Sequence, residues 1–231
     1  MISELDSVEI LRNDFVNNFS HELKTPLVSI KGYAEELKRG DLTEEEKNKY
    51  LDIIINESNR LTSLSTNILN LSKVEKQQIL TDTKRVNVGE CVRQVVLMEL
   101  KKIEKKNIFL DLDIDDCYTL ANEGMLEQVF INIIENSIKF TEPNGKINIK
   151  VYGKDSKVIV KIKDNGKGIE RENLNHIFDK FYTTKDKNNN IGNGLGLALA
   201  KRIVDLHEGS IEVSSEKDKY TEFTIILRKE D

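Results

Sequence analysis

Few residues in this sequence could form disulfide bonds, metal sites or membrane spans. Its 231 residues include two cysteines and three histidines. Cys91 and Cys117 lie far apart and match no metal-binding spacing, so we interpret them as buried thiols in a reducing cytosol. No apolar run approaches the ~18 residues that a membrane-spanning helix needs, and the N-terminus has no signal-peptide pattern. These absences indicate a soluble protein or the cytoplasmic part of a longer one.

A large excess of charge of one sign is also missing. The net charge is −5, although 32% of the residues are charged. The overall field therefore does not attract nucleic acid or an anionic membrane, and a polyanionic ligand must be bound by local groups. We expect no nucleic-acid partner and no membrane contact within the chain, while a membrane-anchored sensor could precede it in a longer protein.

One histidine lies in an unusual helical segment. His21 projects from nearly the opposite side to an apolar stripe, with Thr25 one turn later and Glu22 beside it. Pro26 removes a helical hydrogen bond to the carbonyl of Glu22, so we expect the helix to be loosened or kinked there. An exposed histidine on a helix is usually only a solvated side chain, and His21 alone would not indicate chemistry. The apolar stripe consists of Phe15, Phe19, Leu23, Leu27, Ile30, Ala34 and Leu37.

The first eighty residues predict two long helices joined by a short turn. The first helix spans about 6–39, residues 40–42 form the turn, and the second helix continues to about residue 78. Thr43 and Glu46 match a capping box at the start of the second helix. Because a lone hairpin cannot bury two apolar stripes, we expect two copies to form a four-helix bundle. Without the later motifs, a simple dimerisation bundle would explain this region.

The rest of the chain alternates between helical and strand patterns. The pattern indicates an α+β fold in which helices cover one face of a sheet. Residues 179–193 are mostly polar and are predicted to form a loop. Helices are expected over 89–106, 125–140 and 194–207, and strands over 86–88, 108–114, 118–121, 146–152, 157–164, 210–215 and 220–228.

A helix over 125–140 carries two amides on one face. Asn132 and Asn136 lie one turn apart, and Lys139 follows on the next turn. Amide oxygens are ligands that Mg²⁺ accepts, and a lysine could neutralise a phosphate. A polar helix face without any function would explain the same pattern about equally well.

Two glycine-containing segments follow. Asp164, at a strand end, could accept a hydrogen bond from an exocyclic amine, and Gly166 and Gly168 would let a flat ligand approach the backbone. Such Asp-Asn-Gly sequences are usually simple turns. Gly192, Gly194 and Gly196 open a helix, whose N–H groups and dipole favour a phosphate. Their spacing is not the dinucleotide-binding fingerprint, and there is no Walker lysine.

Residues 176–182 contain Phe178 and Phe181 at the start of the polar loop, where they could simply anchor it. We interpret His176 and His207 as structural, because neither has a carboxylate or metal partner nearby in the sequence.

Taken together, the five segments resemble, in content and order, the catalytic core of a sensor histidine kinase of two-component systems. Residues 19–27 resemble the phosphoacceptor motif, 132–141 the asparagine motif, 164–169 and 192–197 the two glycine motifs, and 176–182 the phenylalanine motif. The resemblance implies a dimeric phosphotransfer hairpin over 1–80, a hinge over 81–88 and an ATP-binding domain over 89–231. The latter would be an α/β sandwich of the Hsp90, gyrase and MutL type.

The resemblance also implies roles for single residues. His21 would take the γ-phosphoryl group of ATP, with Glu22 as its proton acceptor or orienting partner, and pass it to an aspartate of a response regulator. Thr25 would position water for dephosphorylation of that partner. Asn136 would bind Mg²⁺, and Asp164 the adenine amino group. The other nucleotide-binding positions would be Asn132, Lys139, Phe140, Gly166, Gly168, Phe178, Phe181, Gly192, Gly194 and Gly196.

Two departures from the family pattern concern the loop. Lys180 and Thr183 stand where the family often has arginine, and lysine offers a point charge instead of a fork. Residues 188–191 lack the small residue that often precedes the glycines. Two alternatives stay open: a scaffold that binds nucleotide without transferring phosphate, and an ATPase of the chaperone or topoisomerase kind.

Overall fold

The computed structural model describes residues 4–183 and 193–230, with side chains from residue 16 onward. Contacts within the chain group Met1–Asn70 with Lys180–Leu195, and Leu71–Asp179 with Gly196–Asp231. We call these the helical unit and the α/β unit. Every predicted helix and strand is present, and each end lies within two residues of its expected position.

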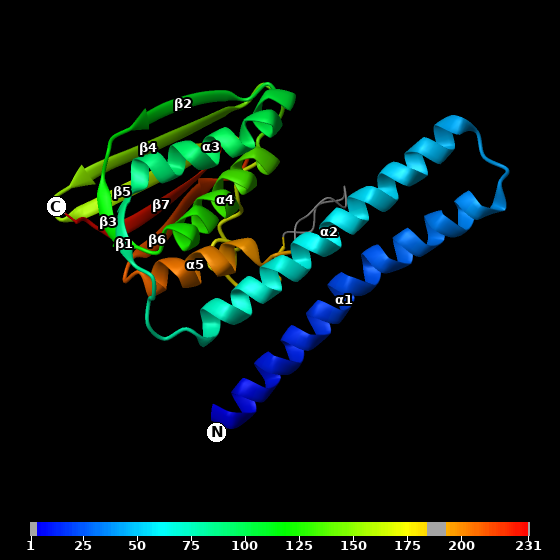
Figure 1. Ribbon diagram of the computed structural model, residues 1–231, viewed down its shortest axis with the longest axis horizontal. Coiled ribbons are helices and arrows are strands. Elements are labelled where there is room, and N and C mark those ends of the chain that lie inside the picture. Colours follow the sequence, from blue (N-terminus) through cyan, green and yellow to red (C-terminus); the bar gives the residue numbers. More distant parts are fainter. Residues whose placement is uncertain (1–3, 184–192, 231) are drawn as a thin grey trace. The chain divides into compact units, whose positions relative to one another are not determined.

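The helical unit contains the two expected long helices, α1 (Glu4–Arg39) and α2 (Glu44–Lys76) (Figure 1). Gly40, at a φ of +88°, adopts the left-handed conformation that ends a helix without strain in glycine. The Thr43 N–H donates to Glu46 Oε2 over 2.9 Å, and the Glu46 N–H donates to Thr43 Oγ1 over 3.3 Å. The reciprocal bonds confirm the capping box. The Thr43 N–H and the Thr43 hydroxyl, which both donate to the Glu46 carboxylate, lower the pKa of Glu46.

Pro26 does not interrupt α1, which continues through it, and its side chain is buried. Along the expected stripe, Leu23 and Ile30 are half-buried, but Leu27 is 54% exposed within the single chain. The Phe15 side chain lies outside the described residues. One chain alone thus leaves part of the α1 stripe in water.

A five-stranded sheet forms the centre of the α/β unit, in the order β2-β4-β5-β7-β6. Only the β2–β4 pair is parallel. The separate pair β1–β3 is antiparallel. The strands are β1 (Lys84–Asn87), β2 (Phe109–Ile114), β3 (Tyr118–Ala121), β4 (Lys146–Lys154), β5 (Lys157–Asp164), β6 (Ser210–Glu216) and β7 (Tyr220–Arg228).

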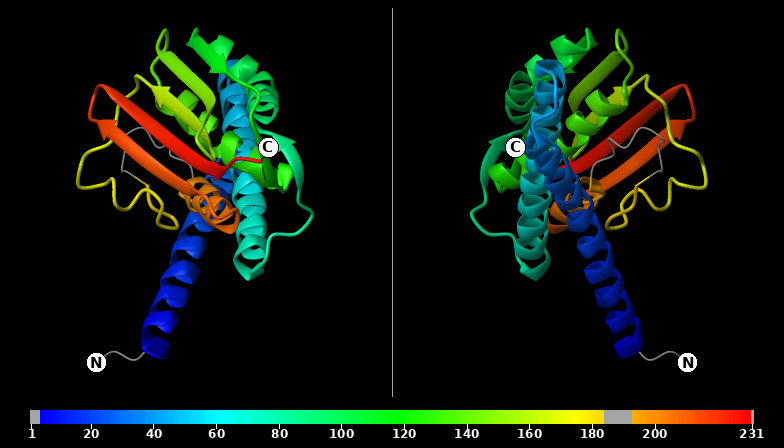
Figure 2. Two further views of the ribbon diagram at one scale, coloured as in Figure 1. Left: turned by 90° about the vertical axis from the view of Figure 1, so that its left-hand side faces the viewer. Right: turned by 90° about the vertical axis from the view of Figure 1, so that its right-hand side faces the viewer.

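Three helices cover one face of this sheet, namely α3 (Val88–Lys105), α4 (Glu123–Phe140) and α5 (Gly196–Leu206) (Figures 1 and 2). Burial alternates along β4, β5 and β7, as expected where one sheet face is covered. The core between the layers includes Phe130 and Ile133 of α4 and Leu199 of α5, all fully buried. The predicted α+β layer arrangement is confirmed.

The connection from α2 to β1 is attached to two of these helices. Arg202 Nη2 of α5 donates to the Gln77 carbonyl over 3.0 Å, and Asn122 Nδ2 donates to the Thr81 carbonyl over 3.1 Å. Asn122 also caps α4, since its side chain accepts the Met125 N–H at 3.1 Å. The last turns of α2 belong to this unit as well, where Leu71 is 2% exposed.

His207 and the cysteines are structural. His207 is buried, its Nδ1 donates to the Ile203 carbonyl over 2.8 Å, and its Nε2 accepts the Asn122 N–H over 3.2 Å. These partners require the neutral ring, and burial lowers the pKa of His207. Cys91 and Cys117 are free and buried, as predicted, and burial raises the pKa of Cys91 to about 12.

Candidate active site

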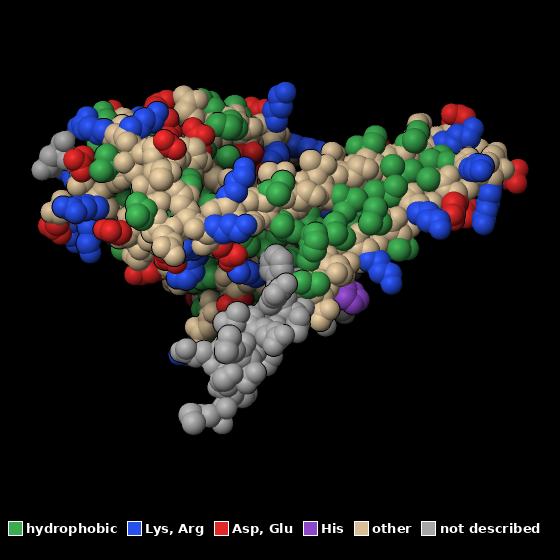
Figure 3. Space-filling model, turned by 60° about the horizontal axis from the view of Figure 1, so that its bottom comes forward, with side chains coloured by type: hydrophobic (Ala, Val, Ile, Leu, Met, Phe, Trp, Pro, Cys, Tyr) green, Lys and Arg blue, Asp and Glu red, His purple; other side chains and the backbone are tan. Residues whose placement is uncertain are grey.

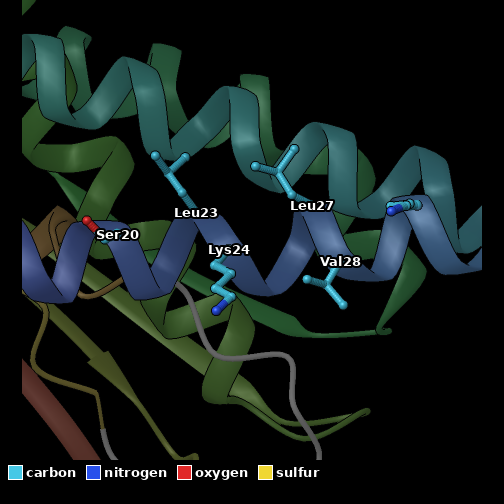
Figure 4. Close-up of a pocket in the computed structure, with 6 residues that line it drawn as sticks. Ser20, Leu23, Lys24, Leu27 and Val28 are labelled. Atoms are coloured by element: carbon cyan, nitrogen blue, oxygen red, sulfur yellow. The ribbon is translucent and has the colours of Figure 1, made fainter.

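His21 lies on α1 with its side chain exposed. Among the described residues no group forms a hydrogen bond with its imidazole. Thr25 Oγ1 donates to the His21 backbone carbonyl over 3.2 Å, so this hydroxyl stays on the same exposed side. Figure 4 shows the neighbouring turns, where Leu23 and Leu27 point toward α2 while Lys24 and Val28 point away from it. The His21 side chain is therefore exposed to solvent, as expected.

Glu22, the expected partner of His21, is bound elsewhere. Its Oε2 accepts a hydrogen bond from Arg60 Nη2 of α2 at 3.0 Å, and both side chains are about one-third exposed. The structure therefore brings Glu22 next to Arg60, and not to the imidazole. Arg60 was missed by the sequence analysis, although the spacing of Glu57 and Arg60 could have indicated an ion pair on α2.

Asn132, Asn136 and Lys139 lie on α4, and all three are half-buried. Asn132 Nδ2 donates to the Gln128 carbonyl over 2.9 Å. A Cβ atom at Gly196 would lie 2.8 Å from Asn132 Oδ1, so the start of α5 approaches Asn132 as closely as glycine permits. The Asn136 amide makes no hydrogen bond within the described part of the chain. Its amide oxygen is thus available as a ligand of the kind that Mg²⁺ binds.

Asp164 ends β5 and is 3% exposed. Its Oδ1 accepts the Gly166 N–H at 3.0 Å. Burial raises the pKa of Asp164 to about 6, against the lowering effects of the Gly166 N–H and the nearby Ser137 hydroxyl. Ser137 Oγ is itself buried without a hydrogen-bond partner among the described residues. An unpaired buried hydroxyl beside a buried carboxyl suits a ligand that carries both donors and acceptors.

The turn after Asp164 packs against the end of α4. A Cβ at Gly166 would lie 2.3 Å from the Phe140 carbonyl oxygen, so this position accepts only glycine. Lys139 Nζ lies 4.9 Å from the centre of the Phe140 ring. Asn132, Asn136, Lys139 and Phe140 thus come from the helix that borders Asp164. Ser137 was not among the predicted site residues, although a polar side chain on the buried face of α4 was an available signal.

Gly168 lies in a turn where the backbone itself requires glycine. At a φ of +61°, it packs against the β6–β7 hairpin, where a Cβ would lie 2.1 Å from the Glu216 carbonyl oxygen. The Asp218 N–H also donates to the Lys167 carbonyl over 2.7 Å. The need for glycine here is explained by this backbone approach.

Phe178 anchors its segment, since its ring meets Phe223 of β7 edge-on with 6.5 Å between the ring centres. In the helical unit, the Phe181 N–H donates to the Gly194 carbonyl over 2.9 Å, and both residues have positive φ values. Two of the predicted motifs are therefore joined directly. Gly192 and residues 188–191 lie outside the described residues, while Lys180 is exposed and Thr183 half-buried.

The reason for interpreting His176 as structural was wrong. His176 does have a carboxylate partner, since its Nδ1 lies 2.9 Å from Asp179 Oδ2, three residues along the chain. Both side chains are more than half exposed, so the pair is a surface contact. His207 agrees with its structural interpretation.

These two units define a class of protein that joins a phosphoacceptor helical hairpin to an ATP-binding domain. Residues 11–77 match the family model of the His Kinase A (phospho-acceptor) domain. Residues 121–231 match the model of the histidine kinase-, DNA gyrase B- and HSP90-like ATPase. The chain therefore carries the two domains of a sensor histidine kinase catalytic core, as the resemblance predicted.

Among curated proteins, the chain is similar to the heme sensor protein HssS of Staphylococcus epidermidis strain ATCC 12228, with 34% identity over 98% of this chain and 49% of the relative. HssS of Staphylococcus aureus strain Newman is 31% identical over 98% of this chain and 49% of the relative. The chain thus spans about half the length of these relatives. No helix within 4–183 or 193–230 is long and apolar enough to cross a membrane.

Among solved structures, the histidine kinase ThkA in complex with the response regulator protein TrrA matches with a TM-score of 0.78 and 28% identity, over 97% of this chain and 64% of that one. Acinetobacter baumannii histidine kinase AdeS matches with a TM-score of 0.74 and 25% identity, over 91% of this chain and 98% of that one.

Proposed function

We propose that this chain phosphorylates its own His21 with ATP and passes the phosphoryl group to an aspartate of a response regulator. The observation that carries this proposal is that one chain holds two features. The His21 imidazole is exposed on a helical hairpin and makes no hydrogen bond with any described residue, and the buried Asp164–Gly166 turn lies beside α4, which carries Asn132 and Asn136. The similarity to ThkA, whose structure contains a response regulator protein, supports the choice of partner.

The chemistry asked of His21 is nucleophilic attack. A neutral ring nitrogen forms a bond to the γ-phosphorus, the bond from that phosphorus to the β–γ bridging oxygen breaks, and ADP leaves with the electron pair. The ring proton passes to Glu22 or to water. Phosphoryl transfer depends mainly on positioning and charge neutralisation, so the protein need supply little more than an accessible imidazole and a held nucleotide.

Nucleotide binding is assigned to positions between Asn132 and Gly196, most of which belong to the α/β unit. Asp164 would accept a hydrogen bond from the adenine amino group, while the buried Ser137 hydroxyl would complete the polar contacts of the base. Asn136 offers a free amide oxygen for Mg²⁺, which neutralises phosphate charge when bound with ATP. The remaining assigned positions are Asn132, Lys139, Phe140, Gly166, Gly168, Phe178, Phe181, Gly192, Gly194 and Gly196.

Dimerisation through the hairpin is the second part of the proposal. Hydrophobic side chains gather along the helical unit (Figure 3). They include Val16, Leu27 and Val28 on α1 and Leu51, Ile55 and Leu69 on α2, each 47–61% exposed. A second copy would bury them in a four-helix bundle. We place the division of the chain at 1–80 and 89–231, with 81–88 as the hinge between them, and the site of action in the cytoplasm.

Incubation with γ-labelled ATP and Mg²⁺ tests the transfer. The wild type should acquire an acid-labile, base-stable label, and His21→Gln should acquire none. A wild type that binds nucleotide without taking up label would instead be a scaffold. Phosphate release that is indifferent to His21→Gln would indicate an ATPase of the chaperone or topoisomerase kind.

For the phosphatase role of Thr25, we expect Thr25→Ala to slow dephosphorylation of the response regulator at least tenfold, because the water loses its hydrogen-bond partner. Autophosphorylation should change less than twofold. The two rates are measured on the same preparation with labelled regulator and labelled ATP. An equal loss of both would show that Thr25 only supports the helix.

A further inference from the structure

Glu22, which follows His21 in the sequence, forms an ion pair with Arg60, a residue outside all five motifs. Arg60 Nη2 of α2 donates to Glu22 Oε2 of α1 over 3.0 Å, across 38 residues of sequence. Both side chains are about one-third exposed, so water weakens this pair only partly. His21, one residue away, has no hydrogen bond in the described part of the chain. In this arrangement Glu22 is therefore unavailable to the imidazole.

A second carboxylate lies on the other side of the same guanidinium. Glu57 Oε2 is 3.9 Å from Arg60 Nη1, too far for a hydrogen bond. The same oxygen is buried without a hydrogen-bond partner among the residues that the structure describes. Arg60 thus forms a hydrogen bond with Glu22 and lies near Glu57 without forming one. A movement of about 1 Å would bring the second contact to hydrogen-bond distance.

Building on the proposed function, we propose that Arg60 is a positioning residue that holds Glu22 away from His21 and moves to Glu57 when Glu22 turns to the imidazole. Removing one partner from a partly buried ion pair is strongly unfavourable when the other charge is left alone. Glu57 removes that penalty, because the guanidinium exchanges one carboxylate for another. The exchange would make the release of Glu22 possible without unfolding any part of the hairpin.

Substitutions of Arg60 and of Glu57 are therefore expected to change the rate of autophosphorylation in opposite directions. Arg60→Gln should free Glu22 and raise the rate of autophosphorylation at saturating ATP at least threefold. Glu57→Gln should remove the negative charge of the second acceptor, keep Arg60 on Glu22 and lower that rate at least threefold. Loss of helix packing alone would lower both rates. Arg60→Lys retains the charge and should return the rate to within twofold of the wild type.

The experiment measures label uptake from γ-labelled ATP with Mg²⁺ in the full chain. The gain in Arg60→Gln should vanish in the double variant Glu22→Gln with Arg60→Gln. Lys47→Gln breaks a more exposed ion pair within α2, Lys47–Glu44, and serves as the control for loss of a cation, with an unchanged rate. A slower Arg60→Gln, or a Glu57→Gln at the wild-type rate, would overturn the proposal.

A second measurement does not depend on catalysis. The ¹⁵N chemical shifts of the His21 ring, assigned with His21→Gln and recorded without ATP, report which ring nitrogen carries the proton. They should change in Arg60→Gln and return to wild-type values in the double variant. If the wild type takes up no label, the proposed function fails while these shifts still decide the role of Arg60. Unchanged shifts in Arg60→Gln would refute that role.

Discussion

At the residue scale, Asp164 and His207 are both buried in the α/β unit, and burial moves their pKa values in opposite directions. The pKa of Asp164 is raised to about 6, so the folded chain takes up a proton there that the unfolded chain does not. The pKa of His207 is lowered, so the unfolded chain takes up that proton first. Acidification below pH 7 therefore favours folding through Asp164 and opposes it through His207.

The ionised Asp164 is expected to be the form that binds adenine. Its protonation turns one acceptor oxygen into a donor, so the Kd of adenosine should rise as the pH falls below 6, by up to about tenfold per pH unit. Adenosine is chosen because it has no phosphate that titrates in this range. Chemical-shift titrations between pH 5 and 8 measure the effect.

Asp164→Asn is the matched control. It keeps an acceptor oxygen without the charge, and should bind adenosine about tenfold more weakly at pH 8 with no further loss at pH 5. Because the ionised carboxyl is held in a buried place, the same change should stabilise the ligand-free protein at pH 8, by an upper bound of about 3 kcal/mol. An adenosine Kd that is independent of pH in the wild type would contradict the assignment.

His207 should make stability depend on pH in the other direction. The neutral ring accepts the Asn122 N–H, and protonation would replace that acceptor with a second donor. Its contribution is complete above pH 6.5, the ordinary pKa, and is lost as the pH falls through the lower value of the folded chain.

Urea unfolding of the wild type and His207→Gln, from pH 7.5 to 5, isolates this contribution. The difference in unfolding free energy should shrink as the pH falls. His176→Gln, at an exposed histidine, is the control for loss of an imidazole. A difference that stays constant over this range would show that the ring of His207 does not titrate in the folded state.

At the scale of elements, the helices that carry the proposed nucleotide site also hold the connection that leaves α2. Arg202 of α5 and the cap residue Asn122 of α4 each donate to a carbonyl of residues 77–81. A displacement of either helix would therefore also move this connection. Asn122 has two separable roles, since its oxygen caps the helix and its nitrogen binds Thr81.

Asn122→Asp keeps the oxygen that caps α4 and removes the nitrogen that binds Thr81. We expect unchanged or higher stability, because an acidic cap suits a helix N-terminus, but faster tryptic cleavage after Lys76 and Lys84. Asn122→Ala removes both groups and should lower the unfolding free energy by about 1 kcal/mol. Asn87→Ala, at the equivalent cap of α3, loses a similar amount without faster cleavage after Lys76. Equal cleavage of Asn122→Asp and the wild type would show that the bond to Thr81 does not restrain the connection.

At the scale of the whole molecule, the exposed stripe of the hairpin predicts self-association. Leu27→Glu would place a charge in the bundle interface and should weaken the dimer at least a hundredfold, because the charge would lose water without gaining a partner. The single chain should keep its fold, since Leu27 is already 54% exposed. Sedimentation velocity at micromolar concentration measures the change.

Leu120→Glu provides the control at a leucine of similar exposure, 53%, on β3 of the α/β unit. It should leave the sedimentation of the wild type unaltered. A wild-type chain that sediments as a monomer at micromolar concentration would contradict the four-helix bundle.

Much of the fold was predictable because its signals are local. Apolar residues at three- and four-residue steps defined α1 and α2, alternation defined β4, β5 and β7, and Thr43 with Glu46 defined a cap. Each of these signals depends on neighbours within one or two turns. The contact between His176 and Asp179 is equally local, because the two residues are only three positions apart, and it was therefore predictable from the sequence.

The sequence by itself determined the elements, the motif order and hence the kinase family, since backbone periodicity and short motifs act over a few residues. Only the tertiary structure decided that Glu22 binds Arg60 instead of meeting His21, that Gly168 serves the β6–β7 hairpin, and that Ser137 faces Asp164. These contacts join residues 27 to 48 positions apart. Which residues meet in these contacts depends on how the helices and strands pack together. That packing minimises the free energy of the whole fold and not that of any one segment.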